Sequence, residues 1–251
     1  MIRRDYILRM VEEFIQALAR LNALKKDNRW QEADGVVDEE FQRLIGMGSQ
    51  AVAQLTKTEL LARLIRGEPT QAVREKTLIL TALLREAGDV AATQGRVESR
   101  ACYLKGLPLL LETLTREEVF AVPEFVPRVE MFAAALHDSL LPLETQALLM
   151  QHYERSGRFA KAEDALFAML EAEPGNAGLV DFGVTFYERL QDQSDACLAA
   201  GNLPRPELEA GLAELLGQKN KLKPQPSWRL TWPTNRQRRG GASICIARVC
   251  A

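Results

Sequence analysis

A spacing of 34 residues recurs in the second half of the chain, and it constrains the possible fold more than any other feature. Tyr153 and Ala162 stand nine positions apart, and Tyr187 and Ala196 repeat that spacing 34 positions later. A fixed period of this length is typical of chains built from stacked supersecondary units, because a single unit cannot cover its own apolar face. The recurrence therefore predicts a repeat architecture.

The clearest unit of the repeat covers residues 143–176. Gly157 has no Cβ and therefore permits a turn with a positive φ. Ala162 is small enough for a second helix to approach the first closely, and Tyr153 fills the space between the two. Pro174 ends the second helix, since proline cannot continue one. We therefore expect two antiparallel helices joined by a turn at Gly157, with Ala162 buried between them.

The order and spacing of Tyr153, Gly157, Phe159, Ala162 and Pro174 resemble the tetratricopeptide repeat. With the weaker copies of this pattern, repeats are placed near residues 14–47, 81–115, 143–176 and 177–210. The resemblance implies an all-α fold in which antiparallel helix hairpins stack as a tetratricopeptide-like right-handed solenoid. A helical bundle without repeats is the alternative, because short loops between neighbouring helices are common to both architectures.

Residues 1–220 are predicted to form the helical repeat domain, and residues 221–251 form a basic tail of different composition. Eight of the 32 lysines and arginines follow Glu214 but none of the 34 acidic residues does, so the first 214 residues carry 24 bases and a formal charge of −10. An acidic body argues against nucleic-acid binding. The tail is interpreted as a disordered extension, although Trp228 and Trp232 beside its arginines also suit nucleic acid or an anionic surface.

The N-terminal segment predicts one amphipathic helix over residues 3–24, whose apolar stripe consists of Ile7, Val11, Phe14, Leu18 and Leu21. That stripe either packs against its own domain or, in a rival hypothesis, forms a homodimer. The opening residues 4–12 resemble the start of an uncharacterised family of bacterial helical proteins, and this resemblance implies no activity. No segment has the roughly 18 apolar residues that span a bilayer, and no signal peptide is evident, so a bacterial cytoplasmic protein is expected.

No residue pattern indicates catalysis, a metal or a cofactor. His137 and His152 lack a cysteine or carboxylate at ligand spacing, and no phosphate-binding glycine loop or nucleophile motif is present. No two of the four cysteines form a CxxC pair, and disulfides are not expected. The cysteines are Cys102, Cys197, Cys245 and Cys250. The chain is therefore predicted to be non-catalytic, with a helical enzyme built from scattered residues as the remoter alternative.

The predicted function is a scaffold or adaptor that binds a protein or peptide in a concave groove lined by the first helix of each repeat. The candidate binding residues are Asn22, Lys25, Lys26, Gln151, Glu154 and Arg155. Lys25 and Lys26 have a second interpretation, as helix-end residues that favour the negative end of the helix dipole. Leu18 stands where chaperone-binding repeats of this class use a lysine, so a carboxylate clamp and a co-chaperone role are not expected.

Overall fold

The computed structural model describes residues 2–66, 70–115 and 122–222, and within these ranges the chain is all-α. The described helices are α1 (Ile2–Lys26), α2 (Trp30–Ile45), α3 (Ser49–Gln54), α4 (Lys57–Ile65), α5 (Thr70–Thr93), α6 (Glu98–Thr115), α7 (Val129–Ala135), α8 (Leu143–Arg155), α9 (Phe159–Ala172), α10 (Ala177–Gln191), α11 (Asp195–Ala200) and α12 (Arg205–Leu222). The predicted disordered tail falls almost entirely on residues 223–251, which lie outside the described part of the chain.

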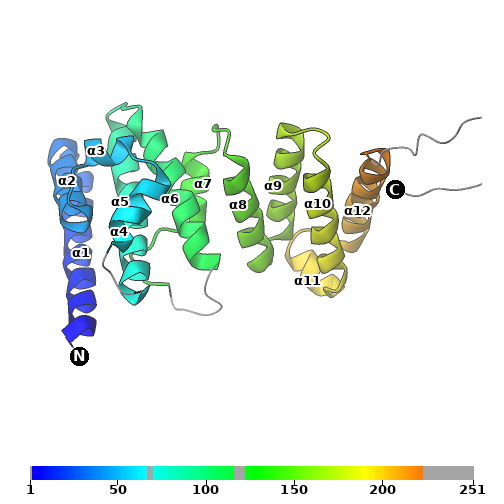
Figure 1. Cartoon of the computed structure of the whole chain (residues 1–251), viewed down its shortest axis with the longest axis horizontal. Coiled ribbons are helices and arrows are strands. Elements are labelled where there is room, and N and C mark those ends of the chain that lie inside the picture. Colours follow the sequence, from blue (N-terminus) through cyan, green and yellow to red (C-terminus); the bar gives the residue numbers. More distant parts are fainter. Residues whose placement is uncertain (1, 67–69, 116–121, 223–251) are drawn as a thin grey trace, which may run out of the picture.

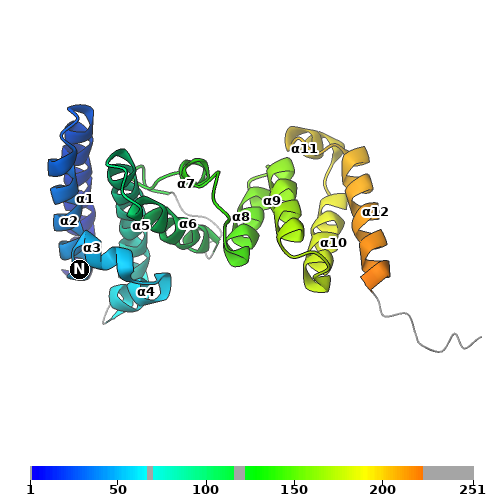
Figure 2. The same ribbon diagram turned by 90° about the horizontal axis from the view of Figure 1, so that it is seen from above.

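The longer helices pack as neighbouring pairs: α1 with α2, α5 with α6, α8 with α9, and α10 with α12. The pairs follow one another along the long axis of the molecule in chain order, and a view turned by 90° shows the same order (Figures 1 and 2). Contacts between α2 and α5, α6 and α8, and α9 and α10 join each pair to the next. The chain is therefore a row of helix hairpins rather than helices arranged around one centre.

Four turns between helices have the same backbone geometry. Asn28, Gly95, Gly157 and Asn202 adopt positive φ values of 57°, 68°, 70° and 58°. At the third turn, the Gly157 amide donates to the Glu154 carbonyl at 3.1 Å and the next amide donates to the Tyr153 carbonyl at 2.9 Å. The other three turns repeat these two hydrogen bonds, which together form a Schellman motif. Glycine and asparagine suit the turn because both tolerate the left-handed conformation.

The third hairpin confirms the expectation for residues 143–173. α8 and α9 form the two helices, with the turn at Gly157 between them. Ala162 is fully buried, and Tyr153 is only 6% exposed. α9 ends at Ala172, two residues before Pro174. Local steric rules and one small residue are thus enough to specify this hairpin.

The fourth hairpin departs from the predicted repeat. The helix that contains Ala196 is α11, which has only six residues, and Ala196 is exposed. The helix that packs along α10 is instead α12. A Cβ atom on Gly211 would lie 2.3 Å from the Tyr187 hydroxyl, so Gly211 is the small residue that permits the close approach. The equivalence of Ala196 with Ala162 was therefore wrong, because Gly201 ends α11 before it can form a full second helix.

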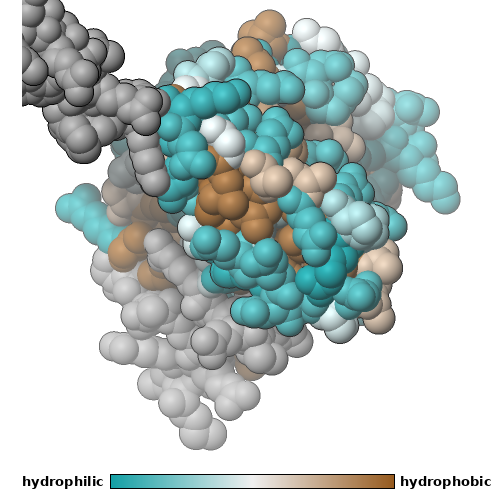
Figure 3. Space-filling model, turned by 90° about the vertical axis from the view of Figure 1, so that its right-hand side faces the viewer, coloured by the Kyte–Doolittle hydropathy of each residue, from teal (hydrophilic) through white to brown (hydrophobic). Residues whose placement is uncertain are grey.

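Two apolar clusters fill the row, one in the N-terminal half and one in the C-terminal half. The stripe of α1 belongs to the first cluster: Phe14 and Leu21 are buried at 1% and 2% exposure, against α2 and α5. This part of the stripe is therefore covered within the chain. At the opposite end of the row, the surface is largely hydrophilic around a small apolar area (Figure 3), and Leu216 of α12 is 41% exposed.

Candidate peptide-binding groove

A cavity of about 680 Å³ opens between α8 and α10, the first helices of two successive hairpins. It is lined by Gln151, Glu154, Arg155, Gly157, Phe159, Phe182, Arg189, Leu190, Gln193 and Cys197. The structure therefore brings together Gln151, Glu154 and Arg155, the three candidate binding residues of the third repeat. This cavity is called the α8–α10 groove below.

The floor of the α8–α10 groove is apolar. Phe159 and Leu190 are 4% and 2% exposed, and Phe182 and Cys197 are half-buried beside them. The turn before α12 contacts the start of α9, next to Phe159: the Ala160 amide donates to the Gly201 carbonyl at 3.0 Å. The floor is thus fixed by backbone contacts between two hairpins before any ligand arrives.

A bidentate ion pair crosses the groove. The Nε and Nη2 atoms of Arg189 donate to the two carboxylate oxygens of Glu154, each at 2.7 Å. The Glu154 side chain is 17% exposed and that of Arg189 is 45% exposed, so the carboxylate is the buried partner. The hydrogen bonds that Arg189 donates to Glu154 raise the pKa of Arg189 above its usual value. Such fork-to-fork pairs have a defined geometry, and this one ties α8 to α10.

Arg155 stands on the rim of the groove. Its Nη1 atom donates to the Thr115 carbonyl at 2.9 Å, at the C-terminal end of α6. A cation is favourable there because carbonyl groups at a helix end are without intrahelical partners. The rim therefore contains two guanidinium groups and one carboxylate, together with the amides of Gln151 and Gln193.

The candidate residues of the first repeat lie elsewhere, at the C-terminal end of α1. Asn22 and Lys26 are exposed. Lys25 is 19% exposed in its side chain and forms ion pairs with Glu86 at 2.7 Å and Asp89 at 3.2 Å on α5. Lys25 therefore fastens α1 to α5. The six candidate residues form two separate groups, one at each half of the row (Figure 1).

Sequence reasoning missed the α10 side of the groove. The predicted groove positions of the third repeat, moved by one 34-residue period, fall on Thr185, Glu188 and Arg189. Arg189 does line the cavity, whereas Glu188 and Thr185 are exposed outside it. The 34-residue period could therefore have identified Arg189 as a residue of the groove. Phe182, Gln193 and Cys197 had no such signal, because their placement depends on how α10 and α11 pack.

A protein-family model described as a family of unknown function (DUF6483) matches residues 1–220. The chain belongs to this family. The DUF6483 match contains the opening segment and every described helix except the last two residues of α12. No curated protein and no solved structure matches the sequence.

No cluster of three or more histidine, cysteine or carboxylate side chains suited to a metal occurs among the described residues. His152 is half-buried against Tyr153, and burial lowers the pKa of its imidazole. None of the described helices is long and apolar enough to cross a membrane.

Proposed function

We propose that the chain is a non-catalytic scaffold that binds a peptide or a helix of another protein in the α8–α10 groove. The observation that supports this most directly is the cavity of about 680 Å³ with an apolar floor and a polar rim. Binding sites for other molecules have this composition, since apolar walls supply affinity and a few polar groups fix orientation. A surface between two first helices also suits a segment that lies along them.

We also propose that the hairpins form a right-handed solenoid of the tetratricopeptide type. The three turns of matching geometry that join α1 to α2, α5 to α6 and α8 to α9 support this, because equal turns give these hairpins a similar shape. Trp30 and Phe159 support it further: each is the first residue of a second helix, and each follows a turn and an arginine. A solenoid exposes the first helices of its repeats on one concave surface, which is where such proteins bind ligands.

The charged groups of the groove favour binding over catalysis. Both carboxylate oxygens of Glu154 already accept hydrogen bonds from Arg189, so this side chain is not placed as a general base. Arg155 is engaged with the Thr115 carbonyl. These groups can orient a partner but do not form a nucleophile with an adjacent base.

Cys197 provides a reporter for the test, because it lies half-buried in the groove while Cys102 is buried at 5% exposure. In a background with Cys245→Ser and Cys250→Ser, a maleimide photo-crosslinker is attached to Cys197. We expect it to crosslink one or a few proteins in an extract of the native cell. Gln151→Trp, which fills the groove from α8, should abolish these crosslinks while circular dichroism remains unchanged.

The matched control moves the reporter away from the groove. It combines Cys197→Ser with Glu171→Cys, an exposed position on the later turns of α9. The proposal fails if both positions crosslink the same proteins, or if Gln151→Trp leaves the Cys197 crosslinks intact.

A further inference from the structure

The row of hairpins ends at α12, and one flank of this helix has no further described helix against it. The buried side of α12 packs on α10 through Leu208 and Leu215, which are fully buried. A second side faces α9, because Gly211 lies against Tyr187, whose hydroxyl donates to Glu163 of α9. The flank turned away from α9 therefore looks out from the end of the row, at the right-hand side of Figure 1 and toward the viewer in Figure 3.

The outward flank of α12 is apolar at its centre. Leu212 and Leu216 lie one helical turn apart on it; Leu216 is 41% exposed and Leu212 is half-buried. Glu209 and Ala213 are exposed beside them. In proteins of stacked hairpins the outer face of the last unit is polar, because no next hairpin covers it. This flank, called the α12 end face below, departs from that rule and offers apolar contact area to another segment.

The last hairpin also carries an excess of carboxylates over free bases. α10 and α12 together contain five acidic and four basic residues. Arg189 and Arg205 are paired with carboxylates of α8 and α11. The remaining bases are Lys219, which pairs with Asp181 at 2.8 Å, and Lys221, so two ammonium groups stand against five carboxylates. The surroundings of the α12 end face therefore favour a cationic occupant.

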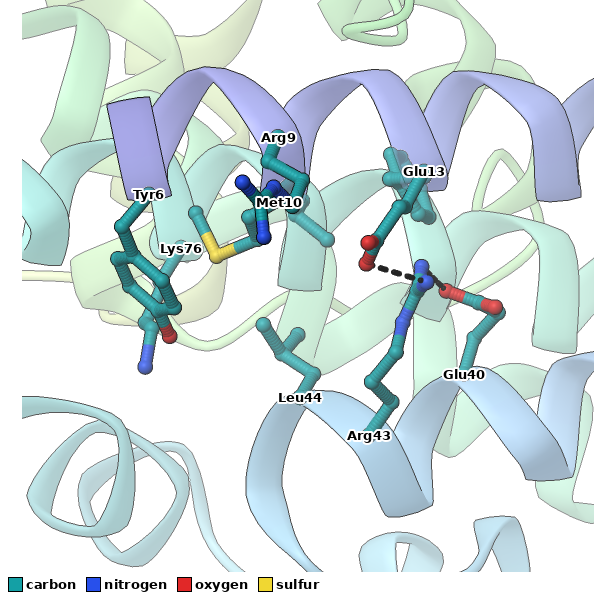
Figure 4. Close-up of a pocket in the computed structure, with 10 residues that line it drawn as sticks. Tyr6, Arg9, Met10, Glu13, Glu40, Arg43, Leu44 and Lys76 are labelled. Atoms are coloured by element: carbon teal, nitrogen blue, oxygen red, sulfur yellow. Dashed lines mark hydrogen bonds and ion pairs between the residues drawn. The ribbon is translucent and has the colours of Figure 1, made fainter. Parts of the chain in front are cut away.

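The hairpin at the opposite end of the row joins its helices by ion pairs that α12 lacks. Arg43 of α2 lies between Glu13 of α1 and Glu40, and forms an ion pair with each (Figure 4). Arg20 of α1 pairs with Glu39 of α2 at 3.4 Å. None of the three glutamates of α12 forms an ion pair with a residue that the structure describes. These glutamates therefore remain available to a cation from another segment.

The segment that follows α12 has the complementary composition. Residues 223–251 contain six lysines and arginines and no acidic residue. Trp228 and Trp232 lie on either side of Arg229 in this segment. An indole ring combines a large apolar surface with one N–H donor, which suits a small apolar area among carboxylates. Residues 224–233 thus match the α12 end face in both apolar character and charge.

The connection between the two parts is short. Leu216 lies six residues before the end of α12 at Leu222, which is about 9 Å along a helix. Trp228 follows Leu222 by six residues, which can span up to roughly 20 Å. A segment tethered this closely meets the α12 end face at a high effective concentration, so a weak contact is enough to hold it there.

From this arrangement we propose that residues 224–233 dock on the α12 end face of their own chain. Trp228 lies on the two leucines of that face, and Arg229 pairs with Glu209. The contact covers the open end of the row, as a capping unit does in other helical repeats. It differs from the interpretation of the tail as a disordered extension, and it neither requires nor excludes peptide binding in the α8–α10 groove.

Tryptophan fluorescence of the full chain tests the proposal. Trp30→Phe leaves Trp228 and Trp232 as the only tryptophans. Phenylalanine suits this position, because Phe159 is the corresponding first residue of α9. We expect folded Trp30→Phe to emit at shorter wavelength than the same chain in urea, and to be quenched less by acrylamide. Both differences should be the same at all protein concentrations, because the contact lies within one chain.

Two leucine variants in the Trp30→Phe background locate the contact. Leu216→Glu should move the emission to that of the unfolded chain while circular dichroism remains unchanged. Leu140→Glu is the matched control, because Leu140 is 87% exposed between α7 and α8, and it should leave the emission unchanged. Removal of residues 223–251 from the otherwise unchanged protein should lower the melting temperature by about 2–4 °C, as expected for a modest contact in a chain of this size.

The proposal is overturned if folded and unfolded Trp30→Phe show the same emission and quenching, if Leu216→Glu leaves the emission at short wavelength, or if the truncation leaves the melting temperature unchanged. An emission that shifts only as the protein concentration rises also overturns it, because the tryptophans would then contact a second copy. The comparison of folded with unfolded Trp30→Phe does not use Leu216→Glu, so it remains decisive even if that variant fails to fold.

Discussion

Arg189 on α10 donates two hydrogen bonds of 2.7 Å to Glu154 on α8, so an ion pair joins two successive hairpins at the α8–α10 groove. Replacement of Arg189 by Met would leave the more buried carboxylate without its partner. We expect the free energy of unfolding to fall by about 1 kcal/mol, because the arginine itself is partly solvated. Urea unfolding of Arg189→Met, Glu154→Gln and the double variant measures the coupling. A coupling energy near zero would contradict the structural role of the pair.

Ala162 and Ala196 occupy equivalent positions in the sequence repeat but not in the structure. Ala162 is fully buried and Ala196 is exposed. Ala162→Leu should therefore cost about 1–3 kcal/mol through overpacking, whereas Ala196→Leu should change stability by less than about 0.5 kcal/mol. Thermal and urea unfolding of the two variants check this difference. Equal losses would mean that α11, rather than α12, packs as the second helix of the fourth hairpin.

Lys25 and Lys26 are adjacent, yet they are expected to differ strongly when replaced. Lys25→Gln leaves Glu86 and Asp89 without their cation from α1, in a site where these side chains are 11% and 21% exposed. We expect a loss of roughly 1–3 kcal/mol for Lys25→Gln and less than about 0.5 kcal/mol for Lys26→Gln, which is exposed. Chemical denaturation of Lys25→Gln and Lys26→Gln measures the two losses in the free energy of unfolding. A similarly small loss of stability for both variants would support the other interpretation, in which both lysines are helix-end residues without specific partners.

The acidic side chain of Glu163 should give a measurable pH dependence. Burial is the main cause that raises the pKa of Glu163, although the hydrogen bond from Tyr187 at 2.5 Å opposes it. The folded chain therefore holds this proton more tightly than the unfolded chain does. As the pH falls through the folded pKa toward the unfolded value of about 4.3, protonation of Glu163 stabilises the fold.

Glu163→Gln removes this contribution, so its gain in stability over the unchanged protein should be larger at pH 7 than at pH 5. Urea unfolding at both pH values gives the difference directly. The conclusion about Glu163 is wrong if the two proteins show the same change in stability with pH.

Much of the local structure could be predicted from the sequence. The turns at Gly95 and Gly157 and the hairpin that follows from Ala162 and Pro174 depend on steric rules that act over a few residues. The three candidate residues on α8 also line one cavity, since the register of a single helix orders its faces.

Only the tertiary structure decided which residues meet across helices. It paired Lys25 with α5, placed Gly211 rather than Ala196 against Tyr187, and brought Arg189 to Glu154. Each of these contacts joins two helices. A sequence pattern specifies which face of a helix is apolar, but the rotation and offset of one helix on another result from packing all side chains at the contact together. The sequence by itself therefore determined the helices and their turns, and packing between the helices determined the cavities.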